Sequence, residues 1–328
     1  MEHTVAEKAL VADLLTTAEN VFGFTAIHAE PIQRGWLNLK WRLETDAGTF
    51  LLKQYNRERL KKYSIPDLEQ VFTKQNHLHT LEFPCPGILS VGANQHFIQS
   101  QGGELFIVMD YCTGNNLPPG KLSREQCYAL GHEAGKLHYQ LRELPPKKRP
   151  VFTPPATSDR VRYWESVREE MRRESKAHLV PMIEKQVQLT KGLSLTDLDV
   201  AATGWSHRDL WVDNLLFTDN QLSAVLDFDR MNYDFPQLDV GRAIISSALA
   251  DAELDMEKAK AFLEGYADYQ VFGKGFLTKA LKLLWYMESV WWLDLAMDER
   301  KGPPKRFVQE MLWLSEHLME LEELVDGN

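Results

Sequence analysis

Residues 204–229 read GWSHRDLWVDNLLFTDNQLSAVLDFD, and this stretch joins a polar loop to a predicted hairpin. The loop carries Asp209, and Asn214 follows it five positions later. Short apolar runs on either side of a Thr-Asp-Asn turn predict two strands, over about 214–218 and 222–227. The second strand ends at Asp227, so we expect the hairpin to bring Asp227 back beside Asp209 and Asn214.

These three polar side chains are the types that phosphoryl transfer from ATP requires. The reaction needs a carboxylate to orient the attacking group and oxygen ligands that hold magnesium against the phosphates. Asp209 suits the first task, while Asn214 and Asp227 suit the second, because magnesium prefers oxygen ligands and keeps several waters. The alternative interpretation is an ordinary polar loop and hairpin whose acids cap turns.

At these positions the chain resembles the kinase-like phosphotransferases, and among them the superfamily of aminoglycoside phosphotransferases and choline kinases. Leu226-Asp227-Phe228-Asp229 is similar to the I-D-W/F-E/D motif of small-molecule kinases, and Asp234–Val240 is similar to their D-P-x-x-D-L-A element. The resemblance implies structural roles for His207 and Asp239, with Asp239 bracing the catalytic loop. Arg208 departs from the family pattern, which usually has a small residue there.

The spacing after Asp227 separates this chain from protein kinases. Only eleven residues lie between Asp227 and Asp239, and no A-P-E sequence follows. Protein kinases need a longer activation segment there to hold a peptide. We therefore expect a small-molecule acceptor.

The resemblance implies that the N-terminal part of the chain covers the nucleotide. Three β-rich runs predict strands over 26–30, 39–45 and 48–54. Gly35 and Asn38, between the first two, match the family's G-G-x-x-N turn, although one glycine is missing. Lys53 occupies the place of the strand lysine that contacts the α and β phosphates; the alternative is a surface lysine on an edge strand.

The partner of that lysine and the hinge are expected farther along the chain. A predicted helix over about 67–81 has no well-placed glutamate, because Lys74 falls in that register and Glu69 lies more than a turn upstream. A predicted strand over 105–109 leads into a segment that matches the family hinge, where backbone groups bind adenine. The hinge residues implied by this match are Asp110, Tyr111 and Cys112.

Composition agrees with two lobes, which we expect at 1–110 (nucleotide lid) and 111–328 (catalysis and acceptor binding). A chain of 328 residues with 44% hydrophobic content can bury both. Its net charge of −10 argues against nucleic acid as a partner. Three unpaired cysteines, with no signal-peptide core and no apolar run of membrane-spanning length, predict a cytoplasmic protein without membrane attachment. The oligomeric state stays open.

The C-terminal helix offers a candidate acceptor site. Trp285, Glu288 and Trp292 share one helical face by their spacing. Aromatic rings beside a carboxylate can hold an ammonium group, so a cationic acceptor is one interpretation. The other is that the aromatic stripe belongs to the core.

Taken together, these patterns predict an α+β, two-lobed, protein-kinase-like fold with a small five-stranded sheet lobe and a larger, mainly helical lobe. The function implied is ATP- and Mg²⁺-dependent phosphorylation of a hydroxyl on a small molecule, with homoserine, methylthioribose, choline and aminoglycosides open as acceptors. The alternative is a kinase-fold assembly protein, such as the spore-coat members of the same superfamily. Intact Asp209, Asn214, Asp227 and Lys53 favour the enzyme.

Overall fold

The chain forms two units, each assembled from two separate stretches of sequence. The first unit contains the N-terminal part through Asn115 together with Ser223–Asp229. The second contains Asn116–Leu222 and the part from Arg230 onward. The computed structural model describes residues 5–33, 38–92, 94–147, 149–198, 200 and 202–326.

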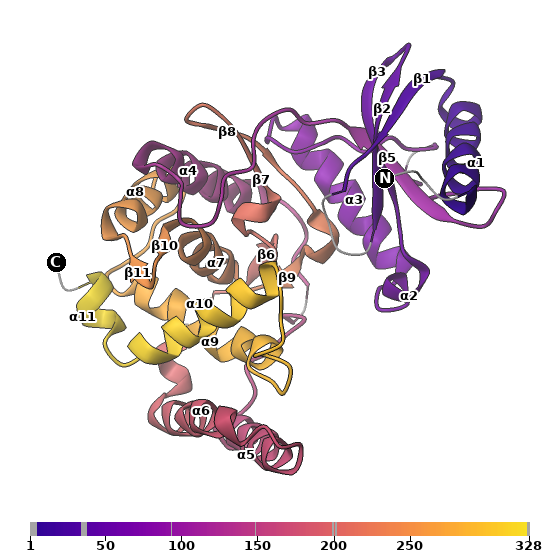
Figure 1. Ribbon diagram of the computed structural model, residues 1–328. Helices are drawn as coiled ribbons and strands as arrows, with labels where there is room; N and C mark the ends of the chain where they lie inside the picture. Colours follow the sequence, from indigo (N-terminus) through magenta and orange to yellow (C-terminus); the bar gives the residue numbers. More distant parts are fainter. Residues whose placement is uncertain are drawn as a thin grey trace. The chain divides into compact units, whose positions relative to one another are not determined.

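An antiparallel sheet of five strands, in the order β1-β2-β3-β5-β4, forms the centre of the first unit (Figure 1). The elements of this unit are α1 (Val5–Phe22), β1 (Ala26–Pro31), β2 (Leu39–Thr45), β3 (Gly48–Gln54), α2 (Arg57–Leu60), α3 (Ile65–Thr80), β4 (Ile98–Gln99) and β5 (Leu105–Asp110). The strands predicted at 26–30, 39–45, 48–54 and 105–109 and the helix predicted at 67–81 are therefore confirmed. The β-rich runs of the first three strands and the continuous apolar run at 105–109 made these strands predictable.

The core of the first unit lies between α1 and the sheet. Leu14 and Ala18 of α1 pack with Trp41 and Leu43 of β2 and with Leu52 of β3, and all five are buried. The hydrophobic effect of this burial fixes the sheet's orientation against α1. As a result, the opposite face of β2 and β3 is left to carry polar side chains.

Helices dominate the second unit (Figure 1). Its helices are α4 (Arg124–Leu141), α5 (Thr157–Arg173), η1 (Ala177–Leu179), α6 (Val180–Gly192), η2 (Leu195–Leu198), η3 (Val212–Asn214), α7 (Pro236–Ala248), α8 (Met256–Tyr266), α9 (Phe276–Trp292), α10 (Pro303–His317) and α11 (Leu321–Asp326). Its strands are β6 (Gly204–Ser206), β7 (Leu215–Thr218), β9 (Asn232–Asp234), β10 (Leu249–Ala250) and β11 (Glu253–Leu254). The chain passes into the first unit along β8 (Gln221–Val225), which pairs with β7 as the predicted hairpin, and returns after the short η4 (Phe228–Arg230).

Helix α4 begins and packs in ways that its sequence explains. The Ser123 hydroxyl accepts the amide of Gln126, and the Gln126 side chain accepts the amide of Ser123, which together form a capping box. Farther along α4, a Cβ added to Gly131 would lie 1.9 Å from the carbonyl oxygen of Phe262 in α8. Only glycine therefore allows these two helices to approach so closely. No helix in the described part of the chain is long and apolar enough to span a membrane.

A buried ion-pair network ties α7 to α9 in the second unit. Arg242 of α7 is 1% exposed and donates to Asp239 Oδ1 over 3.1 Å. It also donates to Glu288 Oε1 of α9, which is equally buried. Burial lowers the pKa of Arg242 to about 10, although the neighbouring carboxylates oppose that shift. Each charge in the network is compensated only while its partners are present.

Replacing Glu288 should therefore destabilise the second unit. Glu288→Ala removes one carboxylate from the buried Arg242, and breaking such a pair costs about 3–5 kcal/mol. Urea unfolding would measure the loss. Glu299→Ala serves as the control, since Glu299 forms a solvent-exposed pair with Lys176 and should leave the free energy of unfolding nearly unchanged. Equal effects of the two substitutions would contradict the structural role of Glu288.

Candidate functional site

The loop after β6 carries the candidate catalytic residue, and Asp239 fixes its backbone. The carboxylate of Asp239, at the start of α7, accepts the amide of His207 over 2.6 Å and the amide of Arg208 over 2.7 Å. Arg208 has a φ of 66°. A non-glycine residue persists in this left-handed region only where surrounding contacts hold it. The two bonds from Asp239 provide that hold.

A chain of hydrogen bonds supports Asp239 from behind. His138 Nε2 lies 3.2 Å from Asp239 Oδ2, and His138 Nδ1 lies 3.0 Å from the Tyr266 hydroxyl. The Tyr266 hydroxyl can donate to Nδ1 while Nε2–H donates to the carboxylate, which satisfies all three groups. Burial would raise the pKa of Asp239, but the bond from His138 and the charge of Arg242 lower it to about 2. Asp239 is thus held as an anion.

Arg208, the departure from the family pattern, has a structural partner. Its Nε lies 2.8 Å from Asp234 Oδ2, and its guanidinium lies over the ring of Phe152, 4.3 Å from the centroid. Burial raises the pKa of Asp234 to about 6, and the charge of Arg208 counteracts that shift. Arg208 therefore ties the loop to β9 and does not need a phosphorylated residue.

Asp209 and Asn214 lie together in the second unit. The side-chain nitrogen of Asn214 donates to the Asp209 carbonyl over 2.9 Å and to Asp209 Oδ2 over 3.0 Å. The amide of Asp209 donates to the buried His207 ring over 3.2 Å. Arg230, which the motif did not single out, has Nη1 3.5 Å from Asp209 Oδ1. The Asp209 carboxylate is thus oriented at one oxygen and faces a cation at the other.

In the first unit, Lys53 lies between two carboxylates that follow β8. Its ammonium is 2.9 Å from Asp227 Oδ1 and 2.8 Å from Asp229 Oδ2. Tyr55 donates its hydroxyl to Asp229 Oδ1 over 2.8 Å. Burial alone would lower the pKa of Lys53, but the two carboxylates raise it well above its usual value. Burial opposes ionisation of Asp227 as well, yet Lys53 and Lys40 lower its pKa.

Asp229 is the site residue that motif reasoning did not assign. Glu69 of α3, the nearest acid to the expected helix position, accepts the amides of His96 and Phe97 over 3.0 and 2.9 Å. It is therefore committed to the loop before β4. The available signal for Asp229 was its place two residues after Asp227 in the Leu-Asp-Phe-Asp sequence.

Lys40 adds a second cation beside Lys53. The two residues are direct partners in the β2–β3 pairing, which puts their side chains on the same face of the sheet. Lys40 is half-buried and forms no ion pair among the described residues. Burial lowers its pKa, and the charge of Asp227 offsets part of that shift. This face of the sheet therefore gathers positive charge at two neighbouring positions.

A magnesium ion needs side-chain oxygen atoms that are not already bound to other groups. Asp227 receives Lys53 at Oδ1, and its side chain is 23% exposed, so Oδ2 can still accept a ligand. The nitrogen of Asn214 is used on Asp209, which leaves the Oδ1 of Asn214 for a cation. Each of these oxygen atoms is of the type that magnesium prefers.

Some of the groups expected to contact the nucleotide already form hydrogen bonds within the first unit. The amide of Asp110 donates to Gly87 O over 2.8 Å, and that of Tyr111 donates to Thr49 O over 3.3 Å. Among the three hinge residues, only the amide of Cys112 has no partner in the described structure. Asn38 is buried, and its side-chain oxygen accepts the amide of Asn56 over 3.1 Å. Gly35 lies outside the described residues.

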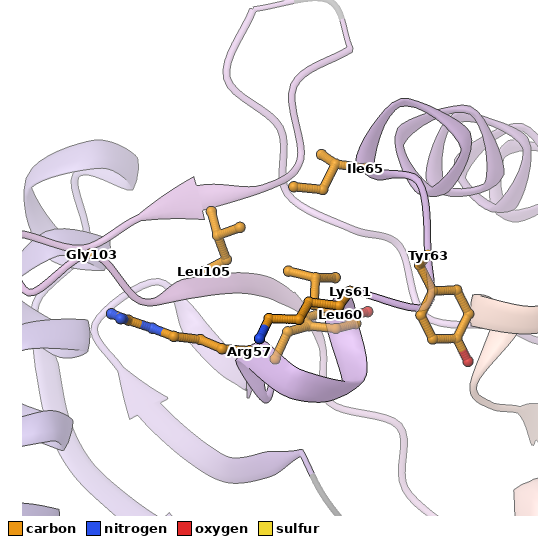
Figure 2. A pocket seen from close by; sticks show the side chains of 8 residues that line it. Arg57, Leu60, Lys61, Tyr63, Ile65, Gly103 and Leu105 are labelled. Carbon is orange, nitrogen blue, oxygen red and sulfur yellow. The ribbon is translucent and has the colours of Figure 1, made fainter.

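A separate pocket of about 470 Å³ lies in the first unit near Tyr55 (Figure 2). Figure 2 shows Leu60, Ile65 and Leu105 around it, with Arg57 at one side. Arg57 is paired with Glu104 over 2.7 Å. The pocket is lined by Tyr55, Arg57, Leu60, Lys61, Tyr63, Ile65, Gly103 and Leu105, none of which is an expected catalytic or metal-binding residue. Its link to the Lys53 cluster is the side chain of Tyr55.

The helical face proposed as an ammonium cage packs inside the second unit. The Trp285 ring is 1% exposed and donates its N–H to Gln186 and Ser315, both over 2.9 Å. Glu288 is equally buried, on Arg242. The Trp292 ring packs against Phe307, with centroids 4.6 Å apart, and Arg300 lies over it. The burial of Trp285 and Glu288, and the pairing of Glu288 with Arg242, favour the core interpretation of this face over the ammonium cage.

Comparison with known proteins agrees with this geometry. The sequence profile described as the phosphotransferase enzyme family matches residues 28–275. Homoserine kinase of Nitrobacter hamburgensis is 25% identical over 244 residues, which cover 72% of this chain and 68% of that protein. Homoserine kinase of Granulibacter bethesdensis is 25% identical over 265 residues, covering 80% and 77%.

Among solved structures, the microcompartment-associated aminopropanol kinase superposes with a TM-score of 0.66 at 13% identity, covering 96% of this chain and 99% of that one. This similarity shows a kinase-like fold, as the sequence predicted. The assembly-protein alternative receives no support from these relatives. Because the profile matches well over half of its length, this chain belongs to the phosphotransferase enzyme family.

Proposed function

We propose that this protein transfers the γ-phosphoryl group of ATP, with magnesium, to a hydroxyl of a small molecule. The observation that carries the proposal is the Asp209–Asn214 pair, held on a loop whose backbone is fixed by a buried anion. Family membership supports the reaction class. The N-terminal lobe, expected at 1–110, would bind the nucleotide, and the lobe expected at 111–328 would supply catalysis and acceptor binding.

The proposed roles follow the chemistry of each side chain. Asp209 accepts the proton of the acceptor hydroxyl as its oxygen attacks the γ-phosphorus, and ADP leaves. Lys53 contacts the α and β phosphates, Asp227 is the main magnesium ligand, and Asn214 is the second. Bound magnesium would neutralise charge on the β and γ phosphates. Cys112 would offer its backbone amide to adenine, with Asp110 and Tyr111 shaping the hinge.

We further propose that the acceptor carries an amine as well as a hydroxyl. The relatives named above are homoserine kinases, and similar solved structures include an aminopropanol kinase and, at a TM-score of 0.60, a choline kinase of Cryptosporidium parvum. Homoserine, aminopropanol and choline all combine a hydroxyl with a cationic nitrogen. The net charge of −10 is compatible with attracting such a molecule.

Removing the proposed base should abolish most of the turnover while ATP still binds. Asp209→Asn keeps the size of the side chain but cannot accept the proton, so kcat should fall roughly 10²-fold or more. ATP affinity, measured by calorimetry, should stay near that of the wild type. The control is Asp219→Asn in the hairpin turn, where Asp219 has a φ of 53° that asparagine also tolerates. Near-normal turnover by Asp209→Asn would exclude Asp209 as the base.

The metal assignment predicts a different defect for Asp227. In the wild type, magnesium should tighten ATP binding, because Asp227 would hold the ion and the ion would offset the charge of the phosphates. Asp227→Asn should remove that dependence, so that titrations with and without magnesium give similar ATP affinities. If the variant kept the magnesium dependence of the wild type, the principal metal ligand would have to be another residue.

A further inference from the structure

The two carboxylates that hold Lys53 differ in what else they must do. Asp227 is the proposed magnesium ligand, and a bound divalent cation becomes the largest local charge and competes for the same carboxylate. Asp229 has no such second task. Once a metal is bound, the interaction that remains for Lys53 within the first unit is the one with Asp229, at 2.8 Å.

Asp229 is placed as a fixed anchor. The residue is 6% exposed, and both of its oxygens are used, Oδ2 by Lys53 and Oδ1 by the Tyr55 hydroxyl. Lys53 and Tyr55 are two positions apart in an extended segment, so they point to the same side of the sheet. Both can therefore reach one carboxylate. The Lys53 ammonium also lies 4.8 Å from the centroid of the Tyr55 ring.

Two other acids of the first unit, Glu69 and Glu104, bind groups other than Lys53. Glu69 of α3 binds the amides of His96 and Phe97. Glu104 binds the side chains of Gln54 and Arg57. Among the described residues, Asp227 and Asp229 are the carboxylates in ion-pair distance of Lys53.

We propose that Asp229, fixed by Tyr55, is the positioning residue that aims the Lys53 ammonium at the nucleotide phosphates. The loop after β8 thereby supplies the carboxylate that kinase-like folds are expected to provide from a helix. This inference rests on the proposed ATP site. It adds a function for the second acid of the Leu-Asp-Phe-Asp sequence and for the tyrosine two residues after the lysine.

The test compares ADP with adenosine in calorimetric titrations that contain magnesium, because without the metal Asp227 also pairs with Lys53. Adenosine lacks phosphates, so its affinity reports the hinge and the folded state of the first unit, while the extra affinity of ADP reports the groups that contact the phosphates, Lys53 among them. Hydrogen bonds between charged groups contribute more binding free energy than neutral ones. Lys53→Ala should therefore weaken ADP binding roughly tenfold or more. Asp229→Asn should cause most of that loss, and Tyr55→Phe about a twofold to fivefold loss, since the latter removes only one bond to Asp229.

Adenosine affinity should be unchanged in all three variants, and Asp229→Glu should recover part of the ADP affinity. In turnover assays, Asp229→Asn should raise KM for ATP while leaving KM for the acceptor unchanged. Glu69→Gln is the matched control, because it neutralises a carboxylate of the same unit that does not contact Lys53. It should bind ADP as the wild type does.

Two results would overturn the positioning role without touching the proposed function. One is wild-type ADP affinity in Asp229→Asn while Lys53→Ala binds weakly. The other is an equal loss of ADP affinity in Glu69→Gln and Asp229→Asn. If the wild-type protein bound neither ADP nor ATP, the nucleotide site itself would be refuted, and the positioning role with it.

Discussion

The buried carboxylate of Asp239 is the constraint on which the candidate catalytic loop depends. It is fully buried, yet His138, Arg242 and two backbone amides keep it ionised. An unpaired anion at this depth would be very costly. The same bonds that make its burial tolerable also hold the left-handed backbone at Arg208. Loop geometry and core stability in the second unit therefore share one set of interactions.

The first unit uses charge differently. There, the ammonium of Lys53 lies among acids that come from a distant part of the sequence, and Lys40 adds a second cation on the same sheet face. This cluster has two cations and two carboxylates, so phosphates and a metal ion would each find groups of opposite charge in it. In our account, the second unit supplies a fixed base and the first unit supplies an electrostatic receptor for the nucleotide.

The sequence predicted the regular elements well, because they follow local patterns. The β-rich runs marked β1 to β3, and the apolar runs on either side of the Thr-Asp-Asn turn marked β7 and β8. The role that we propose for Asp229 could not be predicted in the same way. It depends on Glu69 being used by the loop before β4, and on Tyr55 and Lys53 reaching the same carboxylate. Neither fact is visible from spacing.

For the helical face considered as an acceptor site, the sequence allowed two roles and could not decide between them. Trp285, Glu288 and Trp292 have a spacing that fits a ligand cage and a helix core equally well. The two roles are distinguished by whether the polar side-chain atoms of this face already have hydrogen-bond partners in the folded chain. The Trp285 N–H donates to Gln186 and Ser315. The Glu288 carboxylate accepts from Arg242. The same test applies to the hinge. The backbone amides of Asp110 and Tyr111 donate hydrogen bonds within the unit, while that of Cys112 has no partner among the described residues. Whether a polar group is used within the protein or is open to a ligand depends on the folded structure and cannot be seen in the sequence.

The central claim is that this protein moves a phosphoryl group from ATP to a small hydroxylated amine. Phosphorus NMR of the protein with ATP, magnesium and individual acceptors, including homoserine, aminopropanol and choline, tests it most directly. We predict that one acceptor of this class gives a new phosphomonoester resonance that grows in step with ADP. Formation of ADP and inorganic phosphate alone, or no change in ATP with any hydroxylated amine, would contradict the account.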